Sequence, residues 1–169
     1  MLRTTIINPN AGAGGGGAGL KSSGVLAQSA VAASVTGTTN ETTLATIPIP
    51  AGAMGANGSL RITTLWSYTN SANTKTPRVT LGGTAFFAPA LTTTTAAQAI
   101  TIIRNRNALN SQVGFSSGAG TLGIGSSGNA NVTSAVDMSV AQNLLITGQL
   151  ANSGETLTLE GYTVELLNP

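Results

Sequence analysis

The sequence predicts an all-β protein: a single antiparallel β-sandwich, jelly-roll-like, of about eight strands, with an extended glycine-rich N-terminal arm. Three observations lead to this prediction. From residue 34 onward, apolar residues alternate with polar ones, which is the period of a strand with one buried face. Turn-forming residues recur roughly every 8–15 residues, as they do in sandwiches. No stretch shows a convincing apolar stripe at the helical period of about 3.6 residues.

The N-terminal segment differs in composition from the rest of the chain. Residues 10–19 are almost entirely glycine and alanine, and glycine at this density costs too much backbone entropy to fold alone. We therefore divide the chain into an extended arm, residues 1–33, and a β-sandwich domain, residues 34–169. A fully extended arm of about 30 residues reaches roughly 100 Å. We expect it to lie along neighbouring subunits of an assembly.

Four strands are expected in the first half of the sandwich. The clearest is 59–68, whose larger side chains share one face while the other face is mostly polar. Turn signals, Asn57-Gly58 before this strand and Gly82-Gly83 further on, mark the ends of strands. The four expected strands are residues 42–49, 59–68 and 77–81 and a strand that begins at Phe86 and Phe87.

The second half predicts four more strands, at residues 97–105, 109–116, 143–150 and 155–167. In the last of these, Leu157 and Leu159 share a face, but the apolar residues from Tyr162 onward are out of phase with them by one residue. A β-bulge at or near Gly161 would restore the register. Residues 117–131 are a long Gly/Ser/Asn loop of the kind that is often functional, and residues 134–143 have room for one short turn of helix.

The composition argues against catalysis. The chain has no histidine and no cysteine, which removes the usual ligands of zinc and the softer metals and the usual partners in nucleophilic triads. Among the five acidic residues, Asp137 and Glu160 are the conceivable pair of facing carboxylates that a glycosidase would need. We expect no enzyme activity, no catalytic residue, no metal and no cofactor.

The surface is expected to be nearly neutral. Charged residues make up only 7% of the chain, against about 25% in a typical soluble domain. Arg104 and Arg106 alternate on one predicted strand and are the densest basic feature. They are either two solvated side chains or a contact with an acidic partner surface. The sequence lacks the basic patch and aromatic platforms that nucleic-acid binding needs.

The chain has no run of about 18 apolar residues, so we expect no membrane-spanning helix. Its N-terminus has no apolar stretch of signal-peptide length. We therefore expect synthesis in the cytoplasm and no export by a standard route.

Several segments resemble small structural proteins of tailed bacteriophages. They are residues 49–62 (IPAGAMGANGSLRI), 65–70 (LWSYTN), 145–152 (LITGQLAN) and 159–167 (LEGYTVELL), and the likeness covers residues 45–168. The resemblance implies a place in the virion, either as a capsid decoration (cement) protein or as a domain of a tail fibre or tail tip. It implies no active-site residues.

Two functions follow as hypotheses. The first is a capsid decoration protein that stabilises the head through many copies and the extended arm, with the major capsid protein and copies of itself as partners. We expect a homotrimer in that case, with a dimer as the second choice. The candidate partner contacts are Leu2, Ile6, Ile7, Leu20, Val25, Leu26, Arg104 and Arg106.

The alternative hypothesis is a tail fibre or tail tip module that binds host-surface carbohydrate. Its candidate ligand contacts are Trp66 and Tyr68, or the loop 117–131. The simpler interpretation of both aromatic residues is core packing, in which Trp66 needs an acceptor for its indole N–H.

Overall fold

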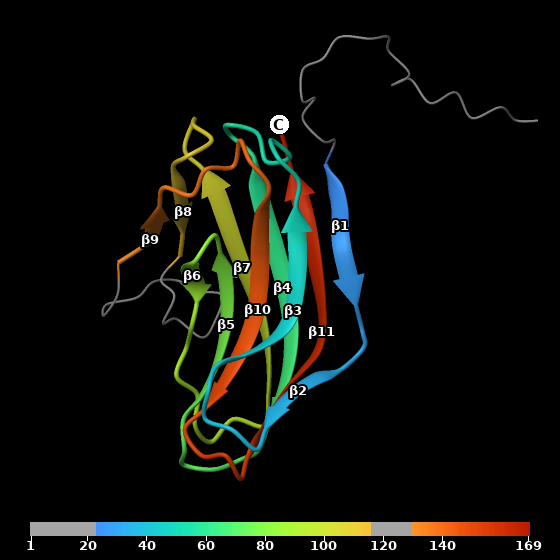
Figure 1. Ribbon diagram of the computed structural model, residues 1–169, viewed down its shortest axis with the longest axis vertical. Coiled ribbons are helices and arrows are strands. Elements are labelled where there is room, and N and C mark those ends of the chain that lie inside the picture. Colours follow the sequence, from blue (N-terminus) through green and yellow to red (C-terminus); the bar gives the residue numbers. More distant parts are fainter. Residues whose placement is uncertain (1–22, 116–129) are drawn as a thin grey trace, which may run out of the picture.

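The computed structural model describes residues 23–115 and 130–169 of the chain (Figure 1). These residues form two antiparallel sheets packed face to face, which confirms the all-β sandwich; the jelly-roll form stays a prediction. Within the same residues there is no helix, so the short helical turn expected at 134–143 is wrong. The Asp137 carboxylate accepts a hydrogen bond from the backbone N–H of Ser139 at 2.9 Å and forms a local turn instead.

The larger sheet has seven strands in the order β1-β11-β4-β7-β8-β9, and β2 also pairs with β11. Its strands are β1 (Gly24–Ser29), β2 (Ala33–Thr36), β4 (Ser59–Tyr68), β7 (Ala96–Asn105), β8 (Gln112–Gly114), β9 (Val132–Ser134) and β11 (Thr156–Leu167). The smaller sheet has four strands in the order β3-β10-β5-β6 and lies in front of the larger one in Figure 1. Its strands are β3 (Thr42–Ile49), β5 (Lys75–Leu81), β6 (Thr84–Phe87) and β10 (Gln142–Leu150).

Each of the eight expected strands has a counterpart, and the described residues add β1, β2 and β9. β1 lies inside the segment assigned to the arm, yet it pairs with β11 from Gly24 to Ser29. The larger sheet therefore begins at Gly24, before the expected domain boundary. The first part of the expected arm, residues 1–22, and most of the loop 117–131 lie outside the described residues.

The core lies between the sheets and follows the expected alternation. On β4, all five side chains expected on one face are buried. Trp66 is fully buried, and its indole N–H donates a hydrogen bond of 2.8 Å to the Thr64 hydroxyl two residues away. The side chain therefore has the acceptor that a buried tryptophan needs.

The bulge expected near Gly161 is confirmed. The register of β11 against β4 shifts between Leu159 and Gly161. Leu157 and Leu159 are buried before the shift, and Val164 and Leu166 after it. The extra residue thus keeps both apolar sets on the core side.

Candidate protein-binding face

The surface that we consider functional is the side of the seven-stranded sheet that points away from the four-stranded sheet, called here the outer face. It follows from the alternation: side chains at odd positions of β4 and at even positions of β7 point outward, because their neighbours are in the core. Adjacent strands align these residues in rows. One row joins Val25, Glu165, Arg61 and Ile102, and the next joins Thr163, Thr63 and Ile100.

The outer face exposes apolar side chains. Of the six large hydrophobic residues exposed in the described part of the chain, four belong to this sheet or its margin: Val25 (56% exposed), Leu65 (47%), Phe115 (40%) and Leu167 (37%). Ile100 and Ile102 are half-buried between them. Exposed apolar side chains gathered on one face of a sheet are typical of a protein-interaction site.

The charges in the middle of the outer face neutralise each other. The Arg61 guanidinium donates two hydrogen bonds to the Glu165 carboxylate, Nε to Oε2 at 2.6 Å and Nη2 to Oε1 at 2.7 Å. This contact lowers the pKa of Glu165 and raises the pKa of Arg61. A bidentate ion pair of this kind presents little net charge to a partner surface.

One end of the outer face is basic. Arg104 pairs with Ser59 on one side and Val113 on the other, and Arg106 follows directly after β7. Both arginines are exposed and line a shallow hollow of about 320 Å³ together with Phe115 and Asn131. Within the described ranges neither guanidinium has an ion-pair partner. Arg104 and Arg106 therefore lie at the margin of an apolar surface, and their contact with an acidic partner stays a prediction.

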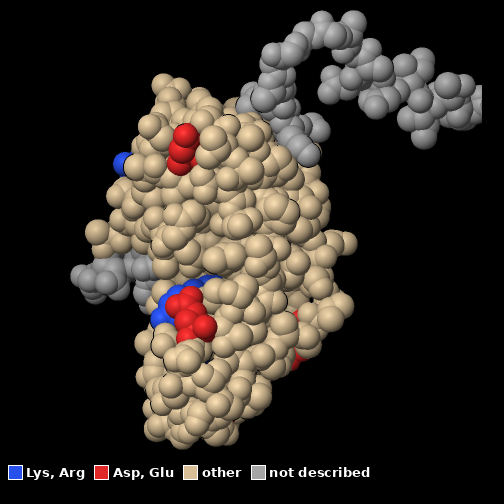
Figure 2. Space-filling model, viewed as in Figure 1, with Lys and Arg blue, Asp and Glu red and all other residues tan. Residues whose placement is uncertain are grey.

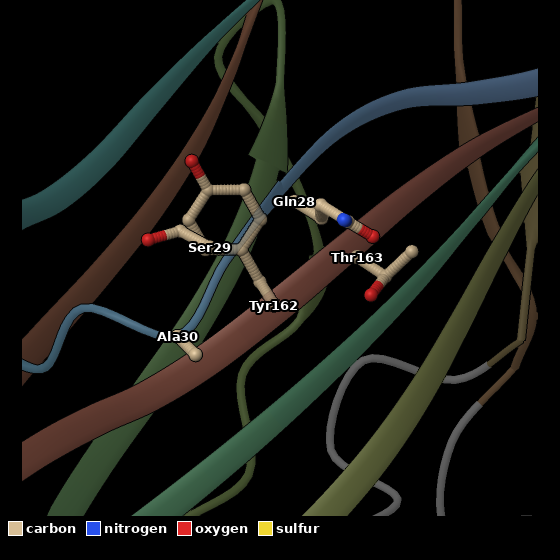
Figure 3. Close-up of a pocket in the computed structure, with 5 residues that line it drawn as sticks. All are labelled: Gln28, Ser29, Ala30, Tyr162 and Thr163. Carbon is tan, nitrogen blue, oxygen red and sulfur yellow. The ribbon is translucent and has the colours of Figure 1, made fainter.

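A second hollow lies at the β1 edge of the sheet (Figure 3). It has a volume of about 400 Å³ and is lined by Gln28, Ser29, Ala30, Tyr162 and Thr163. β1 is an edge strand with a register shift between Val25 and Ala27. Irregular edges of this kind discourage the pairing of further strands.

The aromatic residues proposed for carbohydrate binding are buried in the structure. Trp66 is 0% exposed and Tyr68 lies almost as deep, so neither ring can stack on a sugar. Burial also raises the pKa of the Tyr68 hydroxyl. Of the proposed partner contacts, Val25 and the two arginines are exposed and Leu26 is half-buried. The other four, Leu2, Ile6, Ile7 and Leu20, lie outside the described residues.

The most buried ionic group ties loops together at the end of the sandwich where β4 and β10 finish. Lys75 Nζ lies 3.6 Å from Glu155 Oε2 and donates a hydrogen bond of 2.9 Å to Ser71 Oγ. Ser71 and Asn73 in turn donate to Glu155 Oε1, and these hydrogen bonds lower the pKa of the Glu155 carboxyl. Through Oε1 the carboxylate joins the loop before β5 to the loop before β11, while Oε2 faces the Lys75 ammonium without a hydrogen bond.

The acidic pair considered for glycoside hydrolysis is not brought together. Asp137 bonds to Ser139 in the turn before β10, whereas Glu160 accepts a hydrogen bond of 2.5 Å from Ser67 Oγ on the outer face. Residues 23–115 and 130–169 hold no group of three or more potential metal ligands. The same residues include no helix long and apolar enough to cross a lipid bilayer.

The sequence matches no protein-family model and no curated protein. The solved structures to which the fold is similar include dimeric latent PorU from Porphyromonas gingivalis, at 10% sequence identity and a TM-score of 0.39. They also include infectious bursal disease virus, Gx strain, at 13% identity and a TM-score of 0.27. The chain is covered to 92% and 87% in these comparisons, but it spans only 14% of the PorU chain and 40% of the viral chain. Neither likeness bears on function.

The outer face was not predicted as a site, although the sequence contains a signal for it. Ile102 and Ile103 are adjacent on one strand, and Leu65 adjoins Trp66 on another. Neighbouring residues of a strand point to opposite faces, so one side chain of each apolar pair must point away from the core. Paired strands that carry apolar residues on both faces are therefore the sequence signal that distinguishes this sheet from one with a polar outer face.

Proposed function

We propose that this chain is a structural protein of a bacteriophage virion, a capsid decoration protein that acts by binding protein surfaces and not by catalysis. The observation that carries the proposal is the outer face of the seven-stranded sheet. It combines exposed apolar side chains with an internally neutralised ion pair. Such a surface suits permanent contact with other chains.

The opposite side of the sandwich supports the same function. Figure 2 shows few charged atoms on that side, and in the largest group acidic (red) atoms lie directly against basic (blue) atoms. An ion pair there joins Arg78 Nη1 to Glu41 Oε2 at 3.3 Å. Copies with so little net charge can pack closely on a shell without repelling one another.

A decoration protein stabilises a shell because it binds the assembled lattice in preference to free subunits. Many copies on one particle then act together. The setting that we propose is the head of a tailed bacteriophage, with the major capsid protein as the partner and the expected arm, residues 1–33, as an additional contact. The tail-fibre alternative loses its named ligand residues, since Trp66 and Tyr68 are buried.

The experiment that tests the proposal counts copies of this chain in purified virions. Gel densitometry against the major capsid protein gives the ratio. If the chain is a decoration protein, we expect hundreds of copies per particle, of the same order as the number of shell subunits. A handful of copies would place the chain in the tail and reject the proposal.

A further inference from the structure

The charges on the outer face that lack an ion-pair partner lie at its two ends. Arg104 and Arg106 lie at one end, beside Ser59 at the start of β4. Glu160 lies at the other end and is held by Ser67 near the end of β4. Among the described residues neither arginine has a salt bridge, and Glu160 has none either.

These two ends are too far apart to neutralise each other within one molecule. Ser59 and Ser67 are separated by eight residues of β4 (67 minus 59), which is about 26 Å at a rise of about 3.3 Å per residue. Between them lie the exposed Leu65, the half-buried Ile100 and Ile102, and the Arg61–Glu165 pair. The outer face therefore has positive charge without an ion-pair partner at one end and negative charge without one at the other, while apolar side chains are spread along its length.

We infer that a second copy of this chain covers the outer face in a face-to-face dimer with two-fold symmetry. The inference rests on the proposed function and assigns the outer face to a second copy of this chain, so that the major capsid protein contacts other parts of the surface. The two-fold axis passes near Thr63, parallel to the face and across the strands, so it exchanges the two ends of the face. Arg104 of each copy then meets Glu160 of the other copy. A contact that uses the same patch on both subunits is the isologous interface of a dimer.

The sheet geometry is compatible with this contact. Arg104 on β7 and Glu160 on β11 lie on opposite sides of β4, roughly 10 Å apart across the strands. Packed sheets cross at about 30°, and that rotation moves the two ends of the face sideways toward each other. The dimer is the second of the two oligomers expected from the sequence, and the charge arrangement favours it because a three-fold contact joins two different patches.

The area buried between the two copies determines the affinity that we expect for the dimer. The long strands β11, β4 and β7, about 26 Å long and about 4.8 Å apart, together with the shorter β1 and β8, give roughly 500 Å² per copy. Two copies then bury about 1,000 Å², the smallest area expected of a specific interface. We expect a dissociation constant in the micromolar range, so that monomer and dimer exchange with concentration.

Charge reversal tests the pairing directly. Sedimentation velocity of the full chain over a concentration series should show that Arg104→Glu and Glu160→Arg each weaken the dimer by about tenfold or more, because like charges then meet twice. The double variant should return to within about threefold of the wild type. Thr46→Glu is the matched control, because Thr46 is exposed on β3 in the other sheet. Circular dichroism confirms that each variant is folded.

A crosslink locates the axis. The chain has no cysteine, so Thr63→Cys introduces a single thiol at the centre of the outer face. Packed sheets are about 10 Å apart, beyond the 4.4–6.8 Å Cα separation of a disulfide, so a short bismaleimide is the reagent. Thr63→Cys should yield a covalent dimer and Thr46→Cys should not.

The dimer is rejected by a chain that stays monomeric at all concentrations. A double reversal no better than the single ones, or equal crosslinking of both cysteine variants, rejects it as well. These results are independent of the copy number: a monomer present in hundreds of copies per virion would overturn the dimer and keep the decoration role. A two-fold dimer present in a handful of copies would do the opposite.

Discussion

The carbonyl oxygen of Ser29 lies 2.9 Å from the point where a Cβ on Gly161 would stand. The bulge of β11 thus brings the backbone of Gly161 directly beneath the chain that links β1 to β2. A side chain at this position would push against main-chain atoms, which cannot turn aside as a flexible side chain can. Glycine at position 161 is therefore required by this close approach.

Gly161→Ala should destabilise the fold by about 1–3 kcal/mol, the usual cost of overpacking a closed site. Urea unfolding measures the change in free energy. The matched control is Gly24→Ala at the other end of β1, where an added Cβ meets no atom within 4 Å. Equal stability of the two variants would show that the contact with Ser29 relaxes at no cost.

Below about pH 8, stability should depend on pH only in the acid range. Hydrogen bonds lower the pKa of Glu155 and of Asp137, and the contact with Arg61 lowers that of Glu165. A lowered pKa in the folded state contributes stability that is complete above the unfolded value, about 4.3 for Glu, and is lost as the pH falls through the folded value. The chain has no histidine, so the free energy of unfolding should be level from about pH 5.5 to 7 and fall below about pH 4.5.

Unfolding of the wild type and of Glu155→Gln across this range provides the measurement. The variant should be the less stable protein at neutral pH and should lose less stability on acidification. A stability transition centred between about pH 6 and 7 would contradict the account, because no side chain of the composition normally titrates there.

The buried group of Lys75 and Glu155 should behave as a unit. Lys75→Met alone leaves the Glu155 carboxylate beside Ser71 and Asn73 without its cation. Removing one member of a buried pair costs more than replacing both. We expect Lys75→Met to lower the melting temperature more than the double change Lys75→Met with Glu155→Gln. Additive losses in a double-mutant cycle would show that the two charges act independently.

Trp66 offers a direct spectroscopic test, since it is the only tryptophan of the chain. A fully buried indole should emit at short wavelength and resist quenching by acrylamide. Its emission should also remain unchanged when host-surface oligosaccharides are added. A saturable change on addition of sugar would revive the carbohydrate-binding hypothesis.

Strong alternation made much of the fold predictable. β4 occupies the expected range, residues 59–68, because every second side chain there is large and buried. β1 and β2 were not predicted because little of their sequence alternates. Only Leu26 and Ala27 of β1 pack against the core, and the strand is held mainly by main-chain pairing with β11. Pairing of that kind depends on the partner strand and leaves no pattern in the strand's own residues.

The candidate site was less predictable than the fold. The sequence identified Arg104 and Arg106 as a possible contact, and the structure places them at the margin of the outer face. Their relation to Glu160 depends on strand order, because β7 and β11 are far apart in the chain and become neighbours of the same strand, β4. A single sequence does not specify which strands are adjacent, so the two-ended charge pattern emerges only in the folded sheet.

Hydroxyl-radical footprinting of the chain bound to its particle tests most directly whether the outer face is the contact surface. Leu65 and Phe115 report on that face, and Val140, exposed in the turn before β10, is the internal reference. If the outer face is the contact surface, Leu65 and Phe115 should be oxidised more slowly on the particle than in dilute solution, while Val140 is unchanged. Unaltered oxidation of Leu65 and Phe115, with protection at Val140 instead, would show that the contact lies elsewhere.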